Sequence, residues 1–120
     1  MILEMSRVLI VSGKEEEFER VYYEAADIIS TVKGYCGAYL EKSIDQPGVY
    51  YMMVWWRSLD NHLIDFPASP EAARAMPLVL PLFDGMPKVD HVKRIERADL
   101  PLSRPGEQRW MSPMNSRSVT

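Results

Sequence analysis

The chain has 120 residues, of which 47% are hydrophobic and 26% charged, and this balance fits one compact domain with its own core. The formal net charge of -3 excludes a basic field that would attract nucleic acid or anionic lipid. The single cysteine, Cys36, excludes an internal disulfide and a multi-cysteine metal site.

One unpaired thiol is typical of a reducing compartment. The first residues, MILEMSRVLIV, lack the pattern of a signal peptide, and no apolar run approaches the roughly 20 residues that span a bilayer. We therefore expect a cytoplasmic protein that has neither a membrane nor a nucleic acid as its partner.

The first two elements are predicted to be a strand and a helix. Residues 3–11 are apolar on both sides of the strand alternation, with Arg7 as the main interruption, which indicates a strand covered on both faces. Residues 14–30 carry an apolar stripe at helical spacing, preceded by three acidic residues in the first turn, where the helix dipole favours negative charge. The stripe consists of Phe18, Val21, Tyr22, Ala25, Ile28 and Ile29.

Two strands follow and form a predicted hairpin. The sequence of 35–45 alternates as a strand, residues 45–48 (DQPG) are a turn signal, and 49–57 form a third strand. Alternation in this third strand places Tyr51, Met53 and Trp55 on one face and Trp56 on the other, together with Tyr50, Met52 and Val54.

The last part of the domain is predicted to contain two helices and then a strand. Ser58 is an expected N-cap for a short helix over 59–66, and Ser69, followed by a proline and Glu71, is a stronger helix start for residues 70–76. Pro77 and Pro81 predict a broken, irregular segment as far as residue 85. Residues 87–99 are expected to form the final strand.

This order is β-α-β-β-α-β with the second helical element split in two, which predicts an α+β, ferredoxin-like fold with a four-stranded antiparallel sheet. Because the strands are apolar on both faces, two such sheets are expected to pack face to face in a homodimer. Residues 1–98 form the predicted domain. Residues 99–120, rich in Pro, Ser and Arg, are expected to be a tail that is disordered or docked on the partner subunit through Trp110.

Several local patterns resemble the antibiotic biosynthesis monooxygenase family of dimeric α/β-barrel proteins. A Gly-Tyr pair (Gly34, Tyr35) opens the second strand, a proline-containing turn follows it, and Trp-x-Ser (Trp56 to Ser58) ends the third strand. A helix with His and Phe, a Ser before the next helix and a His in the last strand complete the pattern, here His62, Phe66, Ser69 and His91.

The resemblance implies a homodimer with a pocket between sheet and helices in each subunit. Members of the family either oxidise phenols, anthrones or quinols with dioxygen and no metal, flavin or haem, or bind and degrade haem. The haem-binding branch fits poorly, because its axial His belongs in the helix at residues 70–76, which contains no His.

Oxidation without a cofactor requires a group that takes the proton of the ring hydroxyl and a donor that holds the resulting anion. The candidate catalytic residues are His62, Trp56 and Asn61. Candidates for substrate binding are Tyr22, Tyr51, Met53, Phe66, Arg74 and His91. Each also has a structural alternative: core packing for the aromatic residues and methionine, local capping for Asn61, and a solvated surface for Arg74. For His62 the alternative is a hydrogen-bonded structural residue, and for His91 it is a sheet hydrogen bond or an interface contact.

The leading functional hypothesis is therefore a cofactor-independent monooxygenase that acts on a hydroxylated aromatic, anthrone or quinol-like small molecule. The alternative is a non-catalytic dimer of the same fold that binds a small apolar ligand, and haem binding is a third option. Neither a dinucleotide-binding fingerprint, nor a phosphate-binding loop, nor a His-Glu-x-x-His motif is present in the sequence.

Overall fold

The computed structural model describes residues 1–96 of the chain. Its elements follow the predicted order. They are β1 (Ile2–Leu9), α1 (Glu15–Ile29), β2 (Tyr35–Lys42), β3 (Val49–Trp56), a short π-helical turn η1 (Asn61–Asp65), α2 (Pro70–Val79), a 3₁₀ turn η2 (Leu80–Leu82) and β4 (Lys88–Val92). The expected tail at 99–120 lies outside the described residues.

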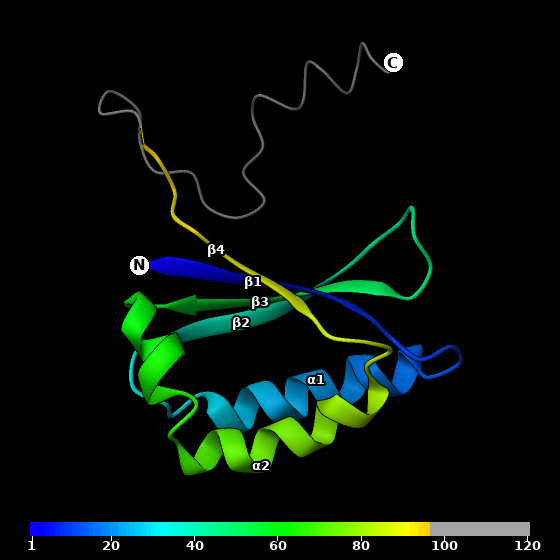
Figure 1. Cartoon of the computed structure of the whole chain (residues 1–120), viewed down its shortest axis with the longest axis horizontal. Helices are drawn as coiled ribbons and strands as arrows, with labels where there is room; N and C mark the ends of the chain where they lie inside the picture. Colours follow the sequence, from blue (N-terminus) through cyan, green and yellow to red (C-terminus); the bar gives the residue numbers. More distant parts are fainter. Residues whose placement is uncertain (97–120) are drawn as a thin grey trace.

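The four strands form one antiparallel sheet in the order β2-β3-β1-β4, and both long helices cover the same face of it (Figure 1). This architecture confirms the predicted ferredoxin-like α+β fold. Among the described residues, none of the helices is both long and apolar enough to cross a membrane.

Helix α1 forms because its apolar stripe can be buried against the sheet while its acidic first turn complements the helix dipole. Phe18 is fully buried and meets the Tyr50 ring edge-on, with centroids 5.1 Å apart. The core continues between the layers through a set of buried side chains that all face inward: Val8, Ile10, Val21, Tyr22, Ala25, Ile29, Val54, Trp56, Ala75 and Val79.

Strand β2 differs from the simple alternation. A register shift between Tyr35 and Gly37 leaves Cys36 as an extra residue, so Tyr35 pairs with Trp56 and joins the core side instead of sharing a face with Gly37. The bulge also places Cys36 on the surface.

Helix α2 begins as predicted but ends later. The Ser69 hydroxyl accepts a hydrogen bond from the Ala72 N–H, which confirms the N-cap. The helix runs through Pro77 to Val79, so the prediction of a break at residue 77 is wrong. Proline removes one helical hydrogen bond here, to the carbonyl of Ala73, and Ala73 is exposed, so water can satisfy that carbonyl.

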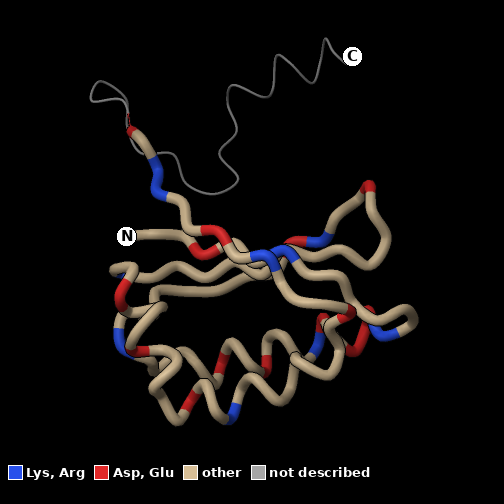
Figure 2. The backbone as a smooth tube through the Cα atoms, in the orientation of Figure 1, with Lys and Arg blue, Asp and Glu red and all other residues tan. Residues whose placement is uncertain are grey.

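The face of the sheet turned away from the helices is also largely apolar. Alternation and register place on it Leu3, Met5, Leu9, Tyr39, Tyr51, Met53, Trp55 and Val92, together with the charged Arg7, Glu41, Lys88 and Asp90. Acidic and basic residues are interspersed along both layers of the described part of the chain (Figure 2). The helix-covered face of the sheet is the one that meets the candidate site.

Candidate functional site

A cavity of about 220 Å³ lies between the sheet and the two helices. Its sheet side comes from β1, β3 and β4, and its floor comes from α1 and α2. Most of its wall is apolar, formed by Tyr22, Ala25, Ala26, Ile29, Met52, Val54, Phe66, Ala75, Met76, Val79, Phe83, Pro87 and Val89. A dry cavity of roughly 150 Å³ holds a benzene-sized ligand, so this volume suits a ring system of one or two rings.

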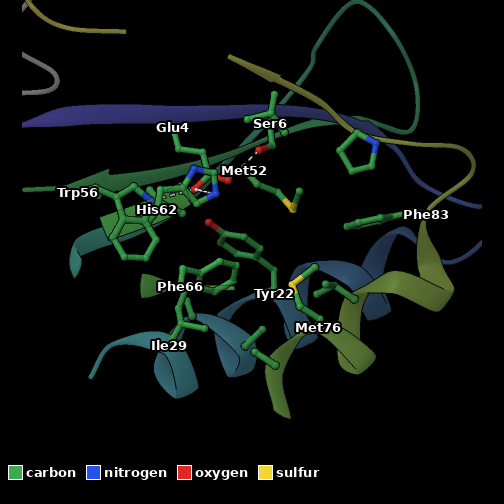
Figure 3. A pocket seen from close by; sticks show the side chains of 17 residues that line it. Glu4, Ser6, Tyr22, Ile29, Met52, Trp56, His62, Phe66, Met76 and Phe83 are labelled. Carbon is green, nitrogen blue, oxygen red and sulfur yellow. Dashed lines mark hydrogen bonds and ion pairs between the residues drawn. The ribbon is translucent and has the colours of Figure 1, made fainter. Parts of the chain in front are cut away.

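The polar groups of the cavity gather at one end, around Glu4 (Figure 3). The Trp56 indole N–H donates to Glu4 Oε1 over 2.9 Å, and the Ser6 hydroxyl donates to Glu4 Oε2 over 3.0 Å. His62 Nε2 lies 3.3 Å from Glu4 Oε1. The side chains of His62 and Glu4 are only 13% and 14% exposed, so this end is a water-poor polar cluster in an apolar cavity.

His62 reaches the cavity from η1, a short π-helical turn. Beside it, the buried Asn61 side chain accepts hydrogen bonds from the Ser58 N–H (3.1 Å) and hydroxyl (2.9 Å) and donates to Asp65 Oδ2 (2.8 Å). These bonds connect the two ends of the turn. Turns of this π type occur often at functional sites, and here the turn presents the imidazole stacked 5.6 Å from the Trp56 ring.

A second histidine stands behind the first. His91 on β4 pairs in register with Glu4 on β1, so its side chain lies on the helix-covered side. Its Nε2 lies 2.7 Å from His62 Nδ1, a hydrogen-bond distance. Both ring nitrogens of His62 are therefore engaged, one by Glu4 and one by His91.

Burial changes the acidity of two groups in this wall. Burial lowers the pKa of His62; the negative charge of Glu4 opposes this shift and the neighbouring His91 adds to it. Burial raises the pKa of Tyr22 far above its usual range, and the charge of Glu4 contributes. The Tyr22 hydroxyl faces the backbone carbonyls of Tyr39 and Met53 at 3.0 and 3.2 Å. Tyr22 thus stays a neutral donor at ordinary pH.

The structure brings four of the nine residues predicted for the site into the cavity wall: Trp56, His62, Tyr22 and Phe66. His91 touches the cavity only through His62. The remaining four lie elsewhere: Asn61 is buried inside its own turn, Arg74 is exposed on α2, and Tyr51 and Met53 lie on the opposite face of β3.

Sequence reasoning missed Glu4 and Ser6, the two polar residues that β1 places at the cavity. The available signal was their spacing, because two polar side chains at alternate positions of an otherwise apolar strand share one face. A carboxylate on a buried face is rare unless it is partnered, and this makes it a candidate functional group.

Within residues 1–96, no group of three or more His, Cys, Asp or Glu side chains is arranged to hold a metal ion. Glu4, His62 and His91 are close in space, but His62 directs one nitrogen at each neighbour, so the three do not converge on a common point. Their arrangement is a chain, in which a 3.3 Å contact joins Glu4 to His62 and a hydrogen bond joins His62 to His91.

Comparison of the sequence with known proteins identifies the family to which it is similar. Residues 1–78 match the model of the family described as antibiotic biosynthesis monooxygenase. The protein YczJ of Bacillus subtilis (strain 168) is 32% identical over 95 residues, which cover 79% of this chain and all of YczJ.

Solved structures agree with the fold. A Bordetella bronchiseptica protein described as an antibiotic biosynthesis monooxygenase is 30% identical, with a TM-score of 0.76 over 79% of this chain and 97% of its own. SnoaB, a cofactor-independent oxygenase from Streptomyces nogalater, is 16% identical, with a TM-score of 0.67 over 82% of this chain and 97% of SnoaB. At that identity, the likeness to SnoaB supports the fold alone.

Proposed function

Since the chain belongs to the antibiotic biosynthesis monooxygenase family, we propose that it is a cofactor-independent monooxygenase that oxidises a hydroxylated aromatic ring with dioxygen. The observation that carries this proposal is the cluster of Glu4, His62 and Trp56 at one end of an otherwise apolar cavity. An apolar wall binds the ring, and a polar end receives its hydroxyl.

The chemistry requires an electron-rich anion. When the ring hydroxyl loses its proton to the polar end, the ring can pass one electron to dioxygen, and the resulting pair combines as a ring peroxide. The peroxide takes back the proton and becomes a hydroperoxide. Its outer OH group then leaves with the hydrogen of the attacked ring carbon as one molecule of water. One oxygen atom stays on the ring as a quinone carbonyl and the other leaves as water, so a phenol and dioxygen give a quinone and water.

The size of the cavity narrows the substrate. Because about 220 Å³ suits one or two rings, simple quinols and naphthols fit better than three-ring anthrones. His62 and Trp56 lie at the end of the cavity that binds the hydroxyl, while Tyr22 and Phe66 form part of the ring-binding wall.

We also propose that the active form is a cytoplasmic homodimer, which would cover the apolar outer face of the sheet.

The test is dioxygen uptake in an electrode cell with 1-naphthol, naphthalene diols, simple quinols and anthrones, and no added cofactor. Uptake above the spontaneous rate is expected for the smaller rings. His62→Ala should lower kcat/KM by roughly 10- to 100-fold, because it removes the imidazole that contacts the Glu4 carboxylate. Trp56→Phe, which removes one hydrogen bond to a charged group, should lower it by roughly 10- to 100-fold.

Matched controls separate chemistry from folding. Leu63→Ala changes an exposed neighbour of His62 in the same turn, and Trp55→Phe repeats the tryptophan change on the opposite face of β3. Both controls should keep near-wild-type uptake. If a control variant lost as much dioxygen uptake as the site variant it is matched to, the assignment of His62 and Trp56 would be contradicted.

The apolar wall of the cavity favours a second candidate, a non-catalytic dimer that carries a small apolar ligand. If none of the compounds raises dioxygen uptake while 1-naphthol binds the wild-type protein in calorimetry, this candidate replaces the oxygenase.

A further inference from the structure

Glu4 is a carboxylate in a place where an apolar side chain would serve stability better. The other helix-facing positions of β1 are Ile2, Ser6 and Val8, and the Glu4 side chain is 14% exposed. Taking a carboxylate out of water costs free energy that its partners only partly return, whereas a leucine in this position would only bury apolar surface. A function for Glu4 in the cavity explains why the carboxylate is there.

The hydrogen-bond capacity of Glu4 is not filled. An ionised carboxylate offers about four lone-pair sites. Oε1 accepts from the Trp56 N–H at 2.9 Å and has His62 Nε2 3.3 Å away, and Oε2 accepts from the Ser6 hydroxyl at 3.0 Å. Among residues 1–96 no further donor reaches Glu4, so Oε2 keeps one site for a ligand in the cavity that Glu4 lines.

The position of the proton on His62 decides which group can act as the base. Only one proton fits between His62 Nδ1 and His91 Nε2, which are 2.7 Å apart. Since His62 Nε2 faces the Glu4 carboxylate, the arrangement that satisfies every contact has His91 donating to Nδ1 and His62 carrying its proton on Nε2. The lowered pKa of His62 is in line with this neutral form. An imidazole nitrogen that already holds a proton cannot take one from the substrate.

We propose that Glu4 is the catalytic base of the site, with Oε2 accepting the hydroxyl proton of a neutral aromatic ring, and that His91 is a positioning residue that fixes the tautomer of His62. The ring O–H bond breaks, the proton binds Oε2, and the charge moves from Glu4 to the ring oxygen. The proton stays on Glu4 until it is transferred to the ring peroxide. A ring that carries a carboxylate in place of the hydroxyl should not bind, because its negative charge would be repelled by that of Glu4. An aryl ether should bind weakly, because it has no O–H group to donate to Oε2.

The proton step rests on the function proposed above, but the recognition of a hydroxyl by Glu4 does not. We therefore measure binding and oxidation separately. The binding pair is 1-naphthol and 1-methoxynaphthalene, compared by isothermal titration calorimetry under nitrogen. A hydrogen bond to a charged acceptor is worth roughly 10- to 100-fold in affinity. The wild-type protein should prefer the naphthol by that factor.

Glu4→Gln keeps the shape of the side chain but puts an N–H donor where Oε2 accepted. The preference for the naphthol should fall to less than about threefold, and oxidation should fall by about 10²- to 10⁴-fold. Glu16→Gln makes the same change in the exposed first turn of α1 and should alter neither quantity. Circular dichroism and the melting temperature confirm that both variants are folded.

Three results would overturn the inference in whole or in part. If the wild-type protein does not prefer the naphthol, Glu4 does not recognise a hydroxyl, and this result needs no variant. If Glu4→Gln oxidises as fast as the wild type, Glu4 is not the base. If oxidation is absent in the wild type while the naphthol preference depends on Glu4, the proposed oxygenase and its proton step fail and recognition stands.

The role of His91 has its own measurement. Nitrogen-15 NMR of the two histidines distinguishes the two neutral tautomers. The wild type should show His62 with its proton on Nε2, and His91→Phe, which removes the donor to Nδ1, should shift His62 toward a mixture. A wild-type His62 with its proton on Nδ1, or an unchanged tautomer in His91→Phe, would overturn this role.

Discussion

His62 is held between a carboxylate and a second imidazole in a place with little water, and this makes its titration visible in stability. Burial lowers its pKa in the folded chain below the usual value of about 6.5. Between these two values the unfolded chain binds a proton at this position that the folded chain does not. The free energy of unfolding should therefore fall as the pH drops from about 6.5 through the lowered pKa.

Urea denaturation between about pH 8 and pH 5 measures this slope. His62→Gln removes the titrating group and should remove its share of the loss, while Glu4 and His91, which face it, are unchanged. The same slope in His62→Gln and wild type would show that this histidine is equally basic in both states.

At the level of residues, the sequence predicts the aromatic part of the site better than the charged part. Trp56 follows from strand alternation and the family pattern, and it lines the cavity. Tyr51 and Met53 were included because β3 is apolar on both faces, so its sequence does not show which face meets the helices. Glu4 was missed because its role depends on Trp56 and His62, which lie 52 and 58 positions later in the chain.

At the level of elements, the contact between Gly34 and Asn61 connects the start of β2 with η1. Gly34 has a φ of +84°, and a Cβ there would lie 2.0 Å from Asn61 Oδ1. Gly13 has nearly the same φ, +85°, but a Cβ at Gly13 would have no neighbouring atom within 4 Å. The two glycines therefore share the same backbone strain on substitution and differ only in this contact.

Gly13→Ala should cost about 1–2 kcal/mol of stability, the strain of a left-handed alanine. Gly34→Ala should cost about 2–5 kcal/mol, because overpacking against Asn61 adds to that strain. It should also move His62 and weaken naphthol binding, which Gly13→Ala should leave unchanged. Chemical denaturation and calorimetry measure both effects, and equal costs for the two glycines would show that η1 yields to the added methyl group.

The elements themselves were largely predictable, and the exceptions have local causes. Caps and periodicity predict where α1 and α2 begin, since the deciding residues are adjacent in sequence. The bulge at Cys36 and the passage of α2 through Pro77 were not predictable, because each depends on packing against another element. The π turn of η1 likewise depends on the bonds that Asn61 makes once the chain has folded.

At the level of the whole molecule, the helices α1 and α2 cover one face of the sheet and leave the outer face without a helix layer among residues 1–96. It carries Leu9 and Val92, which are 41% and 38% exposed, beside the half-buried Tyr51 and Trp55. A cluster of large apolar side chains on the open face of a sheet usually marks a contact with another protein. The face lies opposite the helices, so a second copy could pack against it without closing the cavity (Figure 1).

Trp55→Lys tests the proposed homodimer on this face, on the interior strand β3, where Trp55 pairs with Leu3 and Gly37. Burying a lysine in a sheet-to-sheet contact leaves a charge without a partner, so the variant should sediment as a monomer where the wild type sediments as a dimer. Leu63→Lys makes the same kind of change at an exposed apolar residue of η1 and should leave the dimer intact. A wild type that is monomeric at micromolar concentration would contradict the dimer, and dissociation by Leu63→Lys alone would move the interface to η1.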